Sequence, residues 1–448
     1  MGTGFSLVLT EDGNVAVFGD NAHGQLGVGD VLKRSRPVLL DKMQVFGGEN
    51  IVMVCAGYEQ SACVTKEGSL WVWGSNESGE SGNRSYAQRI LVPVRIDRLE
   101  FGNSHVLMVA MGMSFSMILT AQGHVWTTGS NSEGNLGHGD IMPRYKFTRI
   151  DPTRFGNRTI GMIAAGQDHA MALGKEGGNM LWTWGSNTAG QLGHDHPQAI
   201  SRSVNTPTLL PPDSFAGAAV SLMDADWMYS AVVTVDGVLW GCGMTEFGSR
   251  TMRRFGGAEL FGGSGVRLIS CSLCRMLVVT KDNALWTIAT DGGDVDTAPH
   301  TVVTTATDKK FFDGEGVVVA SAGTTHFGAL TEPGMLYTWQ LPMLWIDNTA
   351  TLGHGGEQVI SLDMDDSMPR GFTADAFNME RLGRWHEYQE HMLAFAMGTH
   401  AHLAAAGDRT AYSAEFPEEL LVDIFQCLRV RSRGGTSDGF QDLLGTLR

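Results

Sequence analysis

Basic residues are scarce in this chain: 32 lysines and arginines stand against 48 aspartates and glutamates in 448 residues, a formal net charge of −16. Nucleic-acid phosphates are bound by clustered basic side chains, so this balance argues against direct binding of DNA or RNA. No run of about 18 apolar residues occurs, and no signal-peptide pattern opens the chain. We therefore expect contact with neither nucleic acid nor membrane.

Cysteine is also sparse, with six residues at uneven spacing. Such usage predicts reduced thiols and a cytoplasmic or nuclear location. Cys271 and Cys274 form a single CxxC pair, whereas a structural zinc site needs four ligands, so we predict no metal. His194 follows a Leu-Gly pair, as His138 and His354 do, which favours a turn residue over a ligand. Because no P-loop, dinucleotide fingerprint or nucleophile–base set can be assembled, we predict a non-enzymatic protein without a cofactor.

Glycine, by contrast, is abundant: there are 58 glycines, about twice the usual share. Many of them recur at fixed places in a unit repeated seven times. Each unit holds a strand, a short polar turn and a second strand that usually ends in glycine, as in SACVTKEGSLWVWGSNESGESG over residues 61–82. The same point of the unit is marked, at intervals of 46 to 60 residues, by Thr10, Thr65, Thr120, Gly174, Thr234, Thr280 and Thr331.

Two further strands are visible in each repeat. One begins near a proline, such as Pro37 or Pro93, and the other runs into a glycine, as in residues 51–57. Four short strands in about 50 residues match the size of a propeller blade. In pairs such as Trp71 and Trp73, one ring should pack between blades while the other faces the opposite side of its strand. The sequence predicts an all-β, seven-bladed β-propeller of four-stranded blades.

The repeat L-x-x-x-G-x-(L/V)-(W/Y)-x-W-G-x-N-x-x-G-Q-L-G resembles that of the regulator of chromosome condensation family, whose members form seven-bladed propellers. Its closing turn recurs in phase with the strands at residues 24–27, 134–137 and 190–193. The resemblance covers residues 1–340 well and 341–407 poorly, and the fifth and sixth copies lack this turn. We predict a propeller over residues 1–407 and a tail over residues 408–448.

Closure of the ring has two solutions in the sequence. Residues 392–398 match the glycine-ending inner strand of earlier units, so a second strand of the same blade should pair with them. Residues 5–10 and 400–406 both fit that next position, and one of them has to be displaced. An unclosed ring would leave a strand edge exposed.

Propellers commonly bind partners through loops on one face, and exposed aromatic residues and single acids are favoured at protein contacts. We take the loops after the glycine-ending strands as that surface. His169 and His326 start the strands after these loops and should pack structurally, in keeping with the resemblance. For each binding candidate the alternative is an ordinary loop residue. The partner-binding candidates are Tyr58, Phe115, Asp168, Trp227 and Thr325.

The resemblance also implies functions. One family member is the nucleotide exchange factor for the GTPase Ran, and its exchange surface uses an acid in a Gly-x-Asp-His context. Gly166 to His169 match that context, with Asp168 as the acid, although no insertion resembling the family's wedge loop occurs in the first four copies. A plant photoreceptor of the family has Arg after Trp, where Met228 follows Trp227 here. We predict a monomeric protein-interaction platform; exchange on a Ran-like small GTPase is the alternative.

Two segments outside the repeats have helical spacing. Residues 373–392 predict a helical insertion, because Phe377, Leu382 and Trp385 are about three to five apart. Residues 417–428 predict a short helix with one apolar face. The second segment resembles the opening of an F-box, so a ubiquitin-ligase substrate adaptor is a further alternative; a helix packed on the propeller or on a partner is the other. Its binding candidates are Leu421, Ile424, Phe425 and Leu428.

Overall fold

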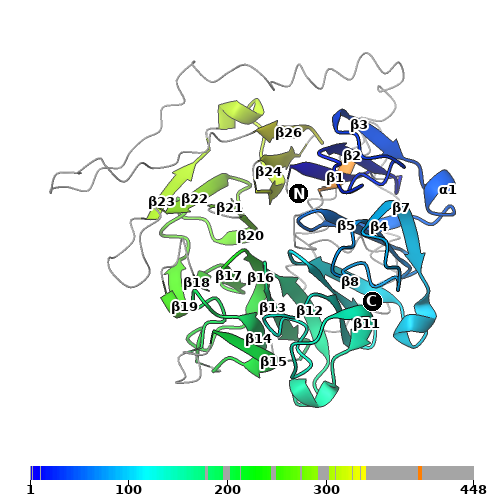
Figure 1. Ribbon diagram of the computed structural model, residues 1–448. Helices are drawn as coiled ribbons and strands as arrows, with labels where there is room; N and C mark the ends of the chain where they lie inside the picture. The colour runs from blue at the N-terminus through cyan, green and yellow to red at the C-terminus, as the bar shows by residue number, and fades with distance from the viewer. Residues whose placement is uncertain are drawn as a thin grey trace, which may run out of the picture.

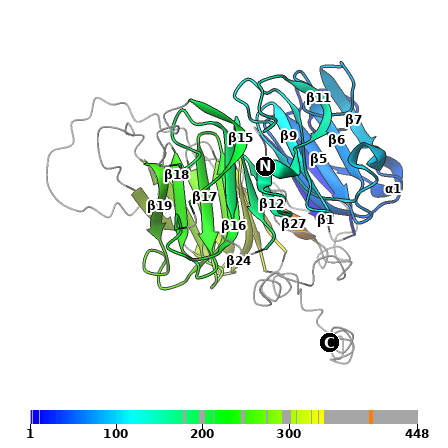
Figure 2. The ribbon, with the colours of Figure 1, turned by 90° about the horizontal axis from the view of Figure 1, so that it is seen from below.

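A computed structural model describes residues 2, 4–10, 12–176, 180–194, 202–211, 213–243, 249–272, 275–290, 302–307, 309–324, 326–332, 334–339 and 392–395. Within these ranges the strands form seven antiparallel sheets, arranged as blades around one axis (Figure 1). Figure 2 shows the ring from its side, with the strands of the blades seen along their length. The predicted seven-bladed β-propeller is confirmed.

The first strand of each blade lies nearest the axis, and the strands that follow it lie progressively farther out. The first blade has β27 (Met392–Phe395), β1 (Phe5–Thr10), β2 (Val15–Gly19) and β3 (Arg34–Leu40). The second has β4 (Ile51–Ala56), β5 (Gln60–Thr65), β6 (Leu70–Ser75) and β7 (Arg89–Ile96). The third has β8 (Val106–Met111), β9 (Phe115–Thr120), β10 (Val125–Gly129) and β11 (Arg144–Arg149). The fourth has β12 (Ile160–Ala165), β13 (His169–Gly174), β14 (Leu181–Ser186) and β15 (Ser203–Leu209).

The remaining blades follow the same order. The fifth has β16 (Val220–Asp226), β17 (Tyr229–Thr234), β18 (Leu239–Gly243) and β19 (Ser249–Gly256). The sixth has β20 (Val266–Ser272), β21 (Arg275–Thr280), β22 (Leu285–Thr290) and β23 (Val302–Ala306). In the seventh, the described strands are β24 (Val317–Ala322), β25 (Phe327–Thr331) and β26 (Leu336–Trp339).

The two ends of the described chain share the first blade. β1 lies between β2 and β27, with Val8 opposite Phe395 and Thr10 opposite Met392 (Figure 1). The solution in which residues 5–10 close the ring is therefore the one found, while residues 400–406 lie outside the described residues. A hydrogen bond of 2.9 Å between Ser6 Oγ and His326 Nε2 joins the first blade to the seventh.

Tryptophans of the third strands pack as predicted. Trp73 and Trp184 are fully buried, and their indole nitrogens donate across the blade boundary to the carbonyl oxygens of Gln25 and Asn135, both at 2.9 Å. The ring two residues earlier lies on the other side of its strand. These contacts explain why the closing turn of one blade and the tryptophan of the next recur together in the sequence.

Short helical turns between blades supply a phenylalanine that the sequence analysis did not single out. They include α1 (Lys42–Val45) and the 3-10 helices η1 (Arg98–Phe101), η2 (Pro152–Phe155) and η4 (Lys309–Phe312). In each of six blades this phenylalanine meets an aromatic ring of the third strand edge to face, with ring centroids 5.2 to 6.0 Å apart. The pairs are Phe46–Trp71, Phe101–Trp126, Phe155–Trp182, Phe215–Trp240, Phe261–Trp286 and Phe312–Tyr337.

Part of the predicted structure falls on residues that are not described. This part comprises the insertion over residues 373–391, the boundary at residue 407, the helix over residues 417–428 and its candidates Leu421, Ile424, Phe425 and Leu428. Met392, the last residue of the predicted insertion, begins strand β27 instead. Among the helices of the described ranges, none is long and apolar enough to cross a membrane.

Candidate partner-binding face

One face of the ring gathers the loops expected to bind. The second strand of a blade starts where its third strand ends, as His169 opposite Gly185 shows. The loop before the second strand and the turn after the third strand therefore emerge on the same side, which we call the turn face. Around the axis it carries loops 57–60, 112–115, 166–169 and 226–229.

Hydrogen bonds tie these four loops to one another from blade to blade. Gln60 Nε2 donates to the carbonyl oxygen of Gly112 at 2.8 Å. The amide of Met113 donates to Gln167 O at 3.0 Å, and the amide of Gln167 donates to Trp227 O at 3.2 Å. Backbone and side-chain bonds thus hold the axial loops of four consecutive blades in one arrangement.

Asp168 sits half-buried in this surface. Burial, and then the negative charge of Glu133 in the neighbouring turn, raise the pKa of the Asp168 carboxyl to about 6. Burial also raises the pKa of the Tyr58 hydroxyl well above its ordinary value, with smaller contributions from Asp226 and Asp168. Tyr58 and Asp168 come from the second and fourth blades, where each lies in the loop between the inner strand and the second strand of its blade.

Trp227 lies at the point of the fifth blade that corresponds to Tyr58 in the second blade, and it is half-buried. Its φ of +24° is in a region that side-chain-bearing residues rarely adopt, and its amide donates to Asp226 Oδ1 at 2.8 Å. The buried Asp226 stands where the loops of the second, third and fourth blades have glycine. This acid holds the loop that presents Trp227.

Phe115 does not belong to the exposed set, and that part of the prediction is wrong. Its side chain is fully buried in the core between the third and fourth blades. Backbone bonds show the true correspondence, because Ser130 N donates to Ser114 O as Ser186 N donates to Asp168 O, both at 2.8 Å. Ser114 is therefore the counterpart of Asp168, and Phe115 is that of His169.

The structural interpretation of His169 and His326 is confirmed. His169 is fully buried, and its Nε2 shares a hydrogen bond of 2.9 Å with Ser230 Oγ of the next blade. A Cβ added at Gly166 would lie 2.1 Å from Cε1 of the His169 ring. Glycine ends this inner strand because the first ring of the following strand occupies the space that a side chain would need.

A pocket of about 240 Å³ lies on the turn face between the first and second blades. A histidine–carboxylate contact and an ion pair line it: His23 Nε2 is 3.3 Å from Glu59 Oε1, and Lys33 Nζ is 2.8 Å from Asp20 Oδ1. It adjoins the axial loops through Glu59. Its polar lining makes it an extension of the same surface rather than an apolar ligand site.

Comparison with known proteins identifies the architecture. The family model of the RCC1-like domain matches residues 1–339. The chain belongs to this family.

Individual relatives share the RCC1-like propeller at moderate identity. The chain is 35% identical over 192 residues to the ultraviolet-B receptor UVR8 of Arabidopsis thaliana, which covers 43% of this chain and 41% of the receptor. It is 24% identical over 335 residues to the RCC2 homolog of Danio rerio, covering 69% and 65%. The chain thus spans less than two thirds of the length of either relative.

Among solved structures, Prp20p from Saccharomyces cerevisiae superposes with a TM-score of 0.59 at 18% identity, covering 75% of this chain and 81% of Prp20p. That structure was described together with the binding of Prp20p to Gsp1p and histones. At this identity the likeness establishes the fold shared by RCC1-like propellers.

Other residues of this RCC1-like chain also bear on the turn face. Met113 is exposed at the same loop position as Tyr58 and Trp227, a correspondence that was readable from its place after the strand-ending glycine. Glu133 influences Asp168 from a different blade, and no sequence signal connects the two. Thr325 lies outside the described residues.

Two of the residues weighed as metal ligands have buried side chains. Cys271 is buried, while Cys274 is not described. His194 is buried and shares a 2.9 Å hydrogen bond between its Nε2 and Thr183 Oγ1, so it is a turn residue as predicted. Across the ranges that the structure describes, no group of three or more His, Cys, Asp or Glu side chains could hold a metal ion.

Proposed function

We propose that this RCC1-like propeller is a non-enzymatic protein-interaction platform whose partner contacts Tyr58, Asp168 and Trp227 on the turn face. The observation that carries the proposal is the hydrogen-bonded chain of axial loops. It holds two aromatic rings and one carboxylate of raised pKa in a fixed arrangement around the axis.

Physical chemistry favours such a surface for binding. Tyr and Trp are frequent anchors at protein interfaces, because a large rigid ring buries much area at small entropic cost. A fixed acid adds selectivity for partners with a complementary charge. The half-buried Asp168 carboxylate lies near Glu133, so a cation from a partner would relieve an unfavourable interaction already present.

Quantitative affinity purification from cells tests the proposal. The full chain is compared with a double variant, Asp168→Ala with Trp227→Ala, and with Leu99→Ala as control. Leu99 is exposed in η1, on the face opposite the turn face. We expect at least one specific partner to fall several-fold for the double variant and to remain for the control. An identical partner profile for all three proteins would refute the proposal.

Exchange of guanine nucleotide on a Ran-like small GTPase is a second candidate. It is favoured by the position of Asp168 on the axial surface within Gly166 to His169. The similarity to Prp20p, whose structure was described together with its binding to Gsp1p, supports it as well. A nucleotide-release assay with the purified full chain and Ran-like GTPases should show acceleration that Asp168→Asn abolishes. Acceleration unchanged by Asp168→Asn, or none at all, removes this candidate and leaves the platform proposal to its own test.

A further inference from the structure

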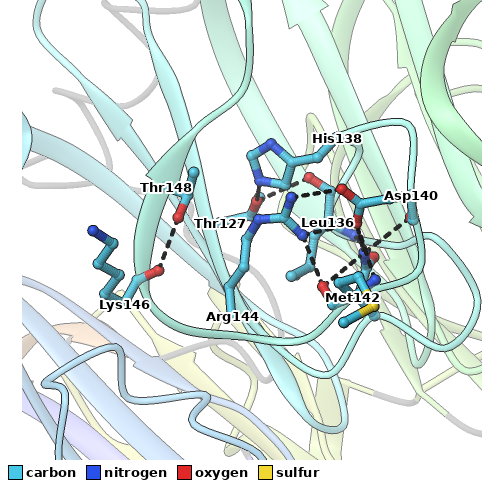
Figure 3. A network of polar contacts seen from close by, with 9 residues as sticks. Thr127, Leu136, His138, Asp140, Met142, Arg144, Lys146 and Thr148 are labelled. Atoms are coloured by element: carbon cyan, nitrogen blue, oxygen red, sulfur yellow. Dashed lines mark hydrogen bonds and ion pairs between the residues drawn. The ribbon is translucent and has the colours of Figure 1, made fainter.

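The turn after the third strand of the third blade holds two apolar side chains in solvent. Ile141 and Met142 follow Asp140, whose Oδ1 accepts a hydrogen bond from the Met142 amide at 3.0 Å. Arg144 closes the turn from the other side, because its Nη1 donates to Met142 O at 2.7 Å and its Nη2 donates to Asp140 Oδ2 at 2.8 Å (Figure 3). These hydrogen bonds of Asp140 and Arg144 brace the turn and fix the conformation of its tip. At the tip, the side chain of Ile141 is 60% exposed and that of Met142 is 64% exposed.

The first blade repeats this construction. Asp30 Oδ1 accepts from the Leu32 amide at 2.9 Å, and Arg34 Nη1 donates to Leu32 O at 2.7 Å. Leu32 and its neighbour Val31 are again exposed. Contiguous exposed apolar residues point to a contact surface more strongly than single ones do, and each of these two turns presents an adjacent pair.

Tyr86 forms the tip of the second blade and lies against the third. Asn76 Nδ2 braces its turn by donating to Ser85 O at 3.0 Å and Ala87 O at 2.8 Å. The Tyr86 ring is 86% exposed, and its centroid lies 5.8 Å from that of the half-exposed Tyr145. Two adjacent blades therefore contribute to one apolar area.

We define the rim patch as Tyr86 and Tyr145, whose ring centroids lie 5.8 Å apart, together with the exposed Ile141 and Met142 in the turn that leads into the strand of Tyr145. Two cations are close to it along the chain: Arg89 begins β7, three residues after Tyr86, and Lys146 follows Tyr145 in β11. Both are exposed, and within the described part of the chain neither lies within ion-pair distance of an acid. An occupant of this patch should combine apolar side chains with negative charge.

We propose that residues 415–428 of the same chain dock on the rim patch. Their sequence, EFPEELLVDIFQCL, has the required chemistry. Leu421, Ile424 and Phe425 share one face at helical spacing, and Glu418 and Glu419 precede them. The negative charges match Arg89 and Lys146, and the apolar face matches the exposed tips.

The chain path allows this contact. β27 lies in the first blade and runs antiparallel to β1, so its carboxyl end at Phe395 is directed toward the turn face. The roughly 20 residues from there to Glu415 can span up to about 60 Å. About twelve residues in a helix would measure about 18 Å, a length suited to the adjoining turns of two blades.

Site-specific photo-crosslinking in the full chain tests the docking. A benzoylphenylalanine at Tyr86 should form crosslinks that mass spectrometry maps to residues 415–428. The same probe at Val235, which is 48% exposed after β17 in the fifth blade, is the control and should give none there. Equal crosslinking from both positions, or none from Tyr86 to this segment, overturns the proposal.

Charge reversal then tests the recognition itself. Arg89→Glu with Lys146→Glu should lower the Tyr86 crosslink at least five-fold, and adding Glu418→Lys with Glu419→Lys should restore it. Near-ultraviolet circular dichroism and the melting temperature establish that each variant is folded. Mixing isotope-labelled and unlabelled chains distinguishes a link within one molecule from a link between two copies. A link between copies, or a yield that charge reversal leaves unchanged, contradicts docking within the chain.

Discussion

At the residue scale, Gly74 shows how one backbone conformation holds a blade together. Its φ is +97°, and a Cβ there would lie 2.5 Å from the carbonyl oxygen of Glu59 and 2.8 Å from the Cα of Gln60. Both obstacles are backbone atoms of the adjacent strand, so they cannot move aside independently. We expect Gly74→Val to lower the free energy of unfolding by about 3 kcal/mol or more, measured by urea denaturation.

A second glycine with a positive φ, but with open space around it, separates the effect of backbone strain from that of steric clash. Gly47 has a φ of +66° and no atom within 4 Å of a built Cβ. Gly47→Val should therefore cost only the left-handed backbone strain, about 1–2 kcal/mol. If the two substitutions destabilise equally, the close packing at Gly74 is not the cause of its requirement.

Asp168 predicts a pH dependence of stability. Its folded pKa of about 6 lies above the ordinary value of 3.8, so the folded state favours the protonated carboxyl. The contribution of the Asp168 carboxyl to the free energy of unfolding is fully present below pH 3.8, and it is lost as the pH rises through 6. Asp168→Asn should consequently raise the free energy of unfolding at about pH 7 by about 1–3 kcal/mol and leave it nearly unchanged at about pH 3.5.

Unfolding curves of both proteins at the two pH values provide the measurement. Asp213→Asn, at an exposed loop position, is the control and should shift neither curve appreciably. If Asp168→Asn stabilises the protein at neutral pH, the ionised Asp168 carboxylate lowers the stability of the native protein. Such a loss of stability is common where a group serves binding rather than folding. A destabilising Asp168→Asn at neutral pH would mean that the carboxylate is a structural partner instead.

The site residues were predictable only where the repeat positions them. Tyr58, Asp168 and Trp227 all lie on the axial loops of the turn face because each follows the end of an inner strand. Phe115 was assigned one position out of register with Asp168 and two with Tyr58 and Trp227, since an aromatic residue looks the same in sequence whether it is buried or exposed. The electrostatic effect of Glu133 on the pKa of Asp168 joins two blades, and no periodicity within one repeat predicts it.

At the element scale, the linkers between blades are anchored by their phenylalanines. Phe101 of η1 is buried, and its ring centroid lies 5.8 Å from that of Trp126 and 5.4 Å from that of Phe147. Phe101→Ala should lower the free energy of unfolding by about 3–5 kcal/mol, because it removes a large buried ring from two aromatic contacts. Chemical denaturation followed by tryptophan fluorescence measures the change.

The same short helix contains its own control. Leu99 is exposed two residues earlier, so Leu99→Ala should change stability by less than about 0.5 kcal/mol. Comparable losses at both positions would mean that the helix itself, rather than the buried ring, is what the blade requires.

The strands and the linkers differ in how far sequence predicts them. Alternating apolar residues and recurrent glycines placed the repeated strands, because a strand's two faces are encoded within the strand itself. The edge-to-face pairs join a linker to a strand about 25 residues later, and only the folded path of the linker brings the rings together. The phenylalanines recur in the sequence, but their role depends on that path.

At the scale of the whole molecule, the ring is closed by chain segments that lie far apart. β1 pairs with β27, and Val8 belongs to a buried cluster that includes Val319 and Phe327 of the seventh blade. Sequence left two segments competing for this place because both have the repeat's pattern. The choice depends on which one pairs with β2, and residues 5–10 precede β2 directly, with only four residues between the end of β1 and the start of β2.

Disrupting the contact between the first and seventh blades, which we call the seam, should change how the propeller unfolds as well as how stable it is. Val8→Asp buries a charge between the first and seventh blades, so the ring loses its long-range closure while each blade keeps its local contacts. We expect unfolding to lose cooperativity, with a smaller denaturant slope and separate transitions by fluorescence and by far-ultraviolet circular dichroism. Val125→Asp places the same charge in the cluster between the third and fourth blades, away from the seam. If closure sets the cooperativity, Val125→Asp destabilises but retains coincident transitions, whereas identical behaviour of the two variants would show that any blade boundary serves equally well.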